Sequence, residues 1–216
     1  MKLEPLMNML QRMLEASTVT LEVFFLTLIF SLPLGLLVAK GRMSHLKIVN
    51  IPIKFYLLIM RGTPLILQLI FFYFAPYSLF GITFDRFWAA ILAFSLNYAA
   101  YFSEIFRGGI QSIPVGQHEA AAILGFSKAQ TFFKIIMPQV IKSIIPPMGN
   151  EFMTLVKDTA LAQTIGVMEL FRIANTSSSQ YFSTVPIFVA GVFYLIMNAV
   201  VSYGFSFASK KLEYYR

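Results

Sequence analysis

The polar stretch RGGIQSIPVGQHEAAAILGFSKAQTFFKIIMPQVIK, residues 107–142, interrupts a chain that is otherwise strongly apolar. Pro114 suits the start of a short helix, and Gly125 suits its end. Ser127 and Gln130 have the spacing of a capping box, which predicts a second helix that runs to Pro138. This stretch is therefore too structured to be a simple turn between two apolar segments.

The composition around this stretch indicates an integral membrane protein. Of the 216 residues, 57% are hydrophobic, 16% are aromatic and only 12% are charged, and the mean hydropathy is +0.71. Soluble domains carry about 25% charged residues, so a free cytosolic enzyme, a disordered tail and a secreted module are excluded. The chain has no cysteine, which excludes disulfides, thiolate nucleophiles and Cys-based metal sites.

Five apolar stretches are long enough to cross a bilayer, which takes about 20 mostly apolar residues per helix. They predict an all-α integral membrane fold, one transmembrane domain over residues 1–216. Gly108 and Gly109 are expected to end the third helix, and residues 2–16 to form a separate amphipathic lead-in. The predicted helices are 18–39, 53–75, 86–107, 140–165 and 185–209.

Positive charge is concentrated on alternate connections. Lys and Arg gather in residues 40–54, 107–142 and 210–216, whereas few lie on the opposite side. Because positive charge favours the cytoplasmic side, the N-terminus is predicted outside and the C-terminus in the cytoplasm. The net charge of +7 therefore lies at the membrane edges and does not indicate nucleic-acid binding.

The motif Glu119-Ala120-Ala121 is followed by three residues and Gly125, and after nine more by Ile-x-Met-Pro at 135–138. This pattern resembles the EAA loop of ABC importer permeases, which has Leu in place of Met137, a swap that conserves volume. Other segments look like the polar amino acid permeases of ABC uptake systems, so that the resemblance covers roughly residues 18–209. These are 61–64 (Arg-Gly-Thr-Pro) with Gln68, 100–110, and 147–152 with 157–158.

The resemblance implies a five-helix importer core in a prokaryotic cytoplasmic (inner) membrane. Such a permease would pair with a second permease subunit, either an identical copy or a sibling. It would work with ATP-binding cassette ATPase subunits and an extracytoplasmic solute-binding protein to import a polar amino acid by alternating access. Glu119, Ala120 and Ala121 would then lie on the cytoplasmic coupling helix within residues 108–139, with Gly125 as its hinge. A loop helix resting on the bilayer is the structural alternative.

No nucleotide-binding motif of the form Gly-x4-Gly-Lys-Ser/Thr occurs in the sequence. We therefore expect ATP and magnesium to be used by a partner ATPase, and this chain to be a transport subunit without a cofactor, a metal site or catalytic residues. His45 and His118 have no partner pattern and are expected to be solvated.

Polar side chains within apolar helices are costly in a bilayer, which makes them candidates for a substrate path. Carboxylates would bind the ammonium group of an amino acid, and amides its carboxylate. The acidic excess leans towards a cationic amino acid. The candidate residues are Gln68, Asn97, Glu104, Glu151, Lys157 and Asp158.

Each candidate also has a structural explanation. Glu104 could pair with Arg107 one helical turn away. Lys157 could pair with Asp158 or with a nearby carboxylate, and Arg61 could extend to the membrane interface. The amides of the set could equally join two helices by hydrogen bonds.

The sequence leaves two further points open. Residues 166–186 are expected outside, either as a solvated connection, which is favoured, or as a docking surface for a solute-binding protein through Glu169 and Arg172. A gradient-driven secondary amino acid transporter, with its carboxylates carrying protons or sodium, is the alternative function. Five helices are few for such a carrier, and the coupling loop would have no task in it.

Overall fold

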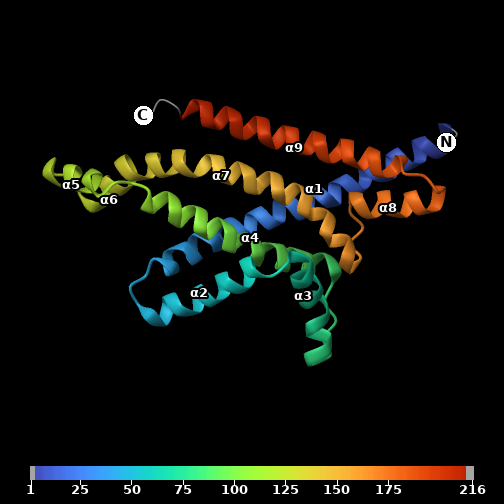
Figure 1. The fold of residues 1–216 in the computed structure, drawn as a ribbon, viewed down its shortest axis with the longest axis horizontal. Coiled ribbons are helices and arrows are strands. Elements are labelled where there is room, and N and C mark those ends of the chain that lie inside the picture. The colour runs from blue at the N-terminus through green and yellow to red at the C-terminus, as the bar shows by residue number, and fades with distance from the viewer. Residues whose placement is uncertain (1–2, 213–216) are drawn as a thin grey trace.

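The computed structural model describes residues 3–212, and this part of the chain is helical without a strand. Four long helices run side by side along the long axis of the molecule (Figure 1): α1 (Leu3–Arg42), α4 (Arg86–Gln111), α7 (Met137–Asp158) and α9 (Val185–Lys211). Helix α4 is central, since Phe94, Tyr98 and Phe102 on it are at most 2% exposed. The all-α prediction is confirmed for this part of the chain.

Helix α1 is one continuous helix of 40 residues. The prediction of a separate lead-in before it is therefore wrong. Met9 and Met13 are buried against Leu170 and Ile173 of α8 (Leu170–Tyr181), so the N-terminal turns contribute to a second hydrophobic core. No glycine interrupts residues 3–34, and the packing against α8 stabilises the N-terminal turns as part of the same helix.

The second predicted helix, 53–75, is two helices. Helix α2 (Lys47–Gly62) and helix α3 (Leu65–Phe80) meet at an angle of 110°. Pro64 has no N–H to donate to the preceding turn, and its ring disfavours a helical conformation at Thr63, whose ψ is 148°. The prediction of a single helix here is corrected to a broken pair.

Helix α4 continues through Gly108 and Gly109 to Gln111, so the prediction that the two glycines end it is wrong. A Cβ atom at Gly109 would lie 2.3 Å from Ile144 of α7. The missing side chain thus serves the close approach of α4 and α7. At its other end, Asp85 caps α4 by accepting from the N–H groups of Phe87 and Trp88 at 3.0 and 3.1 Å.

The polar stretch folds as a short helix followed by a helical segment that leads back to the bundle. Helix α5 (Val115–Ile123) begins after Pro114, as predicted, and α6 (Lys128–Gln130) leads through a π-helix, η1 (Thr131–Ile136), into α7. The capping box is confirmed, since Ser127 N–H donates to the Gln130 side chain at 2.8 Å while Ser127 Oγ accepts from Gln130 N–H at 3.3 Å. After α7 a 3-10 helix, η2 (Thr159–Ile165), completes the predicted stretch 140–165.

Three helices of the described chain, α1, α4 and α9, are long and apolar enough to cross a membrane, and the bent pair α2–α3 is a fourth candidate. Helix α7 falls short by composition because it carries polar and charged groups along its length. Several of these polar groups lie on the face of α7 that meets α4.

Candidate substrate cavity and coupling site

A cavity of about 190 Å³ lies where the α2–α3 break meets α4 and α7. Thr63 and Leu65 come from the break, and the remaining lining residues from the two long helices. Its volume suits a small metabolite rather than a drug-sized ligand. The lining residues are Thr63, Leu65, Asn97, Tyr98, Tyr101, Glu151, Thr154 and Asp158.

Two carboxylates face this cavity without a basic group at ion-pair distance. Glu151, Thr154 and Asp158 recur at helical spacing on one face of α7. Every ion pair within the described residues involves Glu104, so neither Glu151 nor Asp158 forms one. Asp158 Oδ2 accepts a hydrogen bond of 2.7 Å from the hydroxyl of Tyr98, a side chain that is 2% exposed. The hydrogen bond from Tyr98 therefore fixes the position of the Asp158 carboxylate at the cavity.

Gln68 and Asn97 hold the helix break that forms one wall. The Gln68 Nε2 atom lies 3.1 Å from the Met60 carbonyl and 2.8 Å from Thr63 Oγ1. Asn97 Nδ2 donates to the same Met60 carbonyl and to Gln68 Oε1, both at 2.9 Å. Both amides are at most 6% exposed. They therefore satisfy backbone groups that the bend frees, as buried polar groups require, and Asn97 also reaches the cavity lining.

The structure brings only three of the six predicted path residues to the cavity: Asn97, Glu151 and Asp158. Gln68 lies directly behind the lining. Lys157 points into a separate groove of about 620 Å³ between α7 and α9, and makes no ion pair with Asp158 or Glu151. The two spaces share Thr154.

Glu104 lies outside the cavity in a cluster of arginines. Its closest partner is Arg107, whose Nη2 atom is 2.6 Å away, while Arg61 and Arg42 approach to 3.8 and 3.9 Å. This geometry is the i, i+3 pair that its sequence position allows. Arg61 also lies 5.4 Å above the ring of Tyr101, so it stands between the cluster and the cavity.

The coupling-loop residues lie on one short helix and its end. Ala121 is buried while Glu119 and Ala120 are exposed on α5. Gly125 has φ +78° and closes the helix with two hydrogen bonds, from Gly125 N–H to the Ala122 carbonyl and from Phe126 N–H to that of Ala121. These are the bonds of a Schellman motif, which explains why glycine stands there.

Large apolar side chains are exposed on and beside this helix. Their exposed fractions are 67% or more, on a connection that is otherwise polar: Val115, Ile123, Leu124 and Phe133. Exposed apolar groups of this kind mark an interaction surface.

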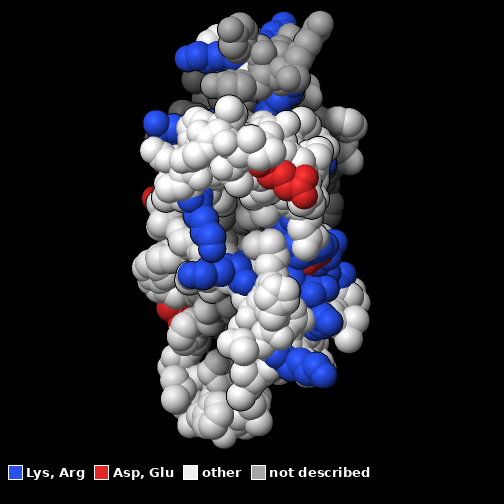
Figure 2. Space-filling model, turned by 90° about the vertical axis from the view of Figure 1, so that its left-hand side faces the viewer, with Lys and Arg blue, Asp and Glu red and all other residues white. Residues whose placement is uncertain are grey.

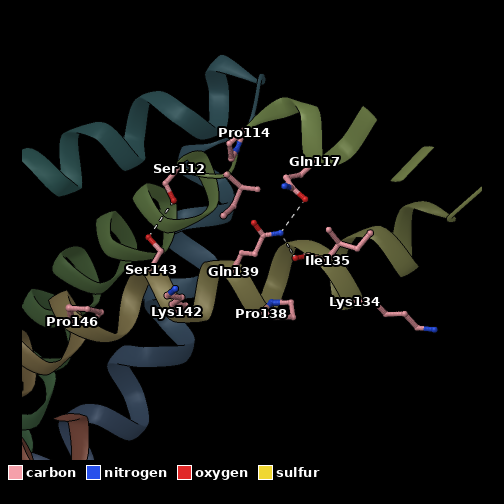
Figure 3. A pocket seen from close by; sticks show the side chains of 11 residues that line it. Ser112, Pro114, Gln117, Lys134, Ile135, Pro138, Gln139, Lys142, Ser143 and Pro146 are labelled. Atoms are coloured by element: carbon pink, nitrogen blue, oxygen red, sulfur yellow. Dashed lines mark hydrogen bonds between the residues drawn. The ribbon is translucent and has the colours of Figure 1, made fainter. Parts of the chain in front are cut away.

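A hollow of about 650 Å³ separates α5 from the start of α7 (Figure 3). Gln139 of α7 bridges it, donating to the Ile135 carbonyl at 2.8 Å and to Gln117 of α5 at 3.5 Å. Ser112 and Ser143 join the same walls nearer the bundle, with their hydroxyls 3.3 Å apart. Helix α5 is thus attached to the membrane helices by few contacts.

Comparison with known proteins gives this arrangement its context. Residues 31–213 match the family model of the binding-protein-dependent transport system inner membrane component. The chain belongs to this family. As a member, it is the permease subunit of an ABC importer and not itself an enzyme, and permeases of this family work with an ATPase and a binding protein. The gradient-driven alternative is not favoured.

Individual relatives of the chain are also named as transport permeases or ABC transporters. An arginine transport system permease protein of Bacillus subtilis is 35% identical, over 93% of this chain and 92% of its own length. An octopine transport system permease protein of Rhizobium radiobacter is 38% identical, over 81% and 76% respectively. The crystal structure of an amino acid ABC transporter with histidines has a TM-score of 0.88 at 31% identity, covering 98% of this chain and 99% of its own. A methionine ABC transporter in inward-facing conformations, at 18% identity and a TM-score of 0.71, shows the same fold.

At the opposite end of the molecule from α5 (Figure 1), Glu169 is fully buried. It is therefore neither part of a solvated connection, which the sequence favoured, nor available to contact a binding protein, which was the alternative. It caps α8 by accepting from the N–H groups of Phe171 and Arg172 at 2.7 and 2.6 Å, and from the Tyr194 hydroxyl at 3.0 Å. Burial raises the pKa of Glu169 to about 7, although the two backbone N–H groups favour its charged form. Arg172 is partly exposed and donates to the Gln163 carbonyl.

Sequence reasoning did not single out Tyr98 and Thr63 as site residues. Tyr98 lies next to Asn97 in a run of small and aromatic residues, and nothing in that run distinguishes it from a packing residue. Only the approach of α7 to α4 places its hydroxyl on Asp158. Thr63 did carry a signal, since the residue before a proline often marks the end of a helix.

Proposed function

We propose that this permease imports a polar amino acid with a cationic side chain, and that the cavity at the α2–α3 break binds it. The observation that carries the proposal is the pair Glu151 and Asp158, two carboxylates inside the helix bundle with no ion pair in the described chain. A partly buried charge without an ion pair is costly within a membrane, so a cationic ligand would stabilise the site. Relatives named for arginine and for octopine transport support this class of substrate.

The lining residues would divide the recognition between them. Asp158, oriented by Tyr98, and Glu151 would accept hydrogen bonds from the two cationic groups of the substrate. Asn97 and Thr63 would shape the wall of the cavity and would not donate to the substrate's carboxylate. The Asn97 amide already donates to Met60 and Gln68, and the Thr63 hydroxyl donates to the Ile59 carbonyl. Lys157 would lie on the path outside the cavity, reached past Thr154, and Gln68 would keep the break in shape. Glu104, surrounded by arginines, would have no direct contact with substrate.

The proposed topology has five crossings, with α2 and α3 together forming one and α7 with η2 another. The end of the molecule that carries α5 and α6 presents many Lys and Arg side chains and few acidic ones (Figure 2), which supports placing it in the cytoplasm. The N-terminus of α1 would then lie outside. A second permease, identical or sibling, would complete the path in the inner membrane, with ATPase subunits below and the solute-binding protein above.

Coupling would run through α5. ATPase subunits that bind ATP and magnesium would hold the exposed apolar side chains of α5 and move this helix as a unit. Gln139 and the η1 segment would pass the movement to α7, which carries the cavity carboxylates. A π-helix is a frequent marker of a functional segment within a helix.

The Gly125→Pro substitution tests the coupling. Proline cannot adopt φ +78° and would break the Schellman motif, so we expect substrate-stimulated ATP hydrolysis to fall more than tenfold while the protein still inserts. Gly125→Asn is the matched control, because Asn tolerates the left-handed region, and it should keep most of the stimulation. Normal uptake by the proline variant would contradict the role of this loop.

The substrate class is tested with the whole importer, purified with its ATPase subunits and reconstituted in proteoliposomes with its binding protein. ATP hydrolysis and uptake are measured for a panel of cationic, neutral and acidic amino acids. We expect stimulation by cationic amino acids above all others. Stimulation by neutral or acidic amino acids alone would overturn the assignment of Glu151 and Asp158, and uptake without ATP would overturn the importer mechanism.

A further inference from the structure

The cluster around Glu104 contains three arginines and a single carboxylate, so its positive charge is only partly neutralised. Arg107 binds the Glu104 carboxylate through Nη2 at 2.6 Å and through Nε at 3.1 and 3.2 Å, so it occupies both oxygens. Arg61 and Arg42 reach the same carboxylate only at 3.8 and 3.9 Å. One negative charge is therefore shared by three guanidinium groups, and one of these already satisfies it.

The remaining cations line a cavity of about 370 Å³ between the α1–α2 hairpin and α4. Arg42, Lys54 and Arg61 contribute positive charge, and Glu104 is the only acidic side chain of the lining. Lys54 forms no ion pair within the described residues. Besides Glu104, the Arg42 side chain has there only a 3.4 Å contact with Asn50 Oδ1. Three donors with spare capacity thus converge on one open space.

The surface beside this cavity is apolar. Ile51, Phe55 and Leu58 follow one another at helical spacing on α2 and are 59%, 63% and 69% exposed. Lys54 and Arg61 stand on the flank of the same stripe, and Leu58 also lines the cavity. A cationic hollow continuous with an exposed apolar stripe fits a molecule that has an anionic head and a hydrocarbon chain.

We propose that this cavity binds the phosphate headgroup of an anionic phospholipid from the cytoplasmic leaflet, with its acyl chain along the α2 stripe. Arg42 and Lys54 would hold the phosphate, and Arg61 would complete the site from its deeper end. Guanidinium groups bind phosphate oxygens in a bidentate fork, whereas an ammonium group acts as a point charge. The proposal rests on the topology in the proposed function, which places the basic connections in the cytoplasm.

Because Arg61 stacks above Tyr101, this lipid site would adjoin the substrate cavity. Arg61 is therefore a poor probe, since its substitution would disturb both sites. Arg42 and Lys54 line only the basic cavity, and Lys47, an exposed lysine of the same hairpin outside the lining, is a matched control.

The test is lipid retention by the intact importer. The complex is purified in mild detergent, exposed to phosphatidylglycerol or to phosphatidylcholine, and examined by native mass spectrometry. We expect retention of phosphatidylglycerol and not of phosphatidylcholine, with a loss of about fivefold for Arg42→Gln or Lys54→Gln and more for the double variant. Lys47→Gln should retain the lipid like the unchanged protein. Size-exclusion profiles report whether each variant is folded.

Three results would overturn the proposal. Equal retention by the Lys54→Gln and Lys47→Gln variants would show that the cavity is not the site. Equal retention of both lipids would show that the negative charge is not recognised. Displacement of phosphatidylglycerol by millimolar inorganic phosphate would identify a soluble phosphate as the ligand. Stimulation by amino acids is measured on the same samples, so failure of the proposed function is seen separately, as absence of stimulation in the unchanged complex.

Discussion

Two regions of this permease contain acidic side chains within the helix bundle, and their surroundings are opposite. Glu104 has three arginines within 4 Å, and its nearest guanidinium nitrogen is at 2.6 Å. Glu151 and Asp158 have no basic group at ion-pair distance in the described chain, and the polar contact of Asp158 is the Tyr98 hydroxyl. The first region is rich in cations and the second is rich in anions.

This difference separates a structural role from a binding role better than residue type does. A carboxylate that is already paired gains little from a cationic ligand, because the ligand would have to displace an arginine. Two carboxylates that lie in a partly buried cavity and form no ion pair gain most from a cationic ligand. The four variants that follow test this contrast, in order of decreasing effect on it.

The largest effect is expected for Glu151→Gln with Asp158→Asn. A hydrogen bond to a charged group contributes about 1.5–3 kcal/mol. The double variant loses two, so its affinity for cationic substrate should fall by at least about 100-fold. Substrate-stimulated ATP hydrolysis at varied concentrations gives the comparison. Stimulation by neutral amino acids should change less. An unchanged half-maximal concentration for every amino acid would show that the cavity does not bind substrate.

Tyr98→Phe should weaken substrate binding about tenfold, because Asp158 loses the hydrogen bond that orients it. The effect should appear as a higher KM with little change in kcat. Tyr101→Phe is the matched control, since the Tyr101 hydroxyl makes no hydrogen bond within the described residues although its ring lines the same cavity. Equal effects of the two variants would assign Tyr98 a packing role only.

Glu104→Gln should act on stability instead of on substrate affinity. Removing the carboxylate leaves three guanidinium groups facing one another, at a cost of about 1–3 kcal/mol, which corresponds to roughly 2–4 °C of Tm per kcal/mol for a chain of this size. Thermal unfolding in detergent measures the loss, with the exposed Glu15→Gln as a control. A rise in KM as large as that of the double cavity variant would contradict the division into two regions.

The variant that bears least on this contrast concerns Glu169, a buried carboxylate outside both regions. Its folded pKa of about 7 lies above the unfolded value near 4.3, so between these values the folded state binds more protons. Stability should therefore fall as pH rises from about 4.5 to 7 and then level off, by on the order of 1–3 kcal/mol. Unfolding midpoints across this range should slope for the unchanged protein and stay nearly flat for Glu169→Gln. Equal slopes would show that Glu169 is ionised throughout.

Local structure in the coupling loop could be predicted residue by residue. Pro114, Gly125, Ser127 and Gln130 act through their own backbone conformation or through a partner three residues away. The substrate cavity could be predicted only as a set of candidates. Asn97, Glu151 and Asp158 lie on three different turns of two helices, and the helical period shows which residues share a face without showing which faces meet.

Sequence reasoning failed where long-range packing competes with a local preference. Gly109 is a poor helix residue, yet the contact with Ile144 of α7 outweighs this and the helix continues. At Pro64 the local preference prevails and the helix breaks. The buried amides of Gln68 and Asn97 satisfy the carbonyl groups that the break frees, which lowers the cost of the sharp bend.

The membrane class, the caps of the coupling helix and the family follow from the sequence alone, because these depend on composition and on spacings within a few residues. The tertiary structure decided which carboxylates are paired and which face an open cavity. That outcome depends on the 110° bend and on the approach of α7 to α4, which bring together residues as far apart as Thr63 and Asp158. Electrostatic energy depends on distance in space, and a sequence specifies distance only along the chain.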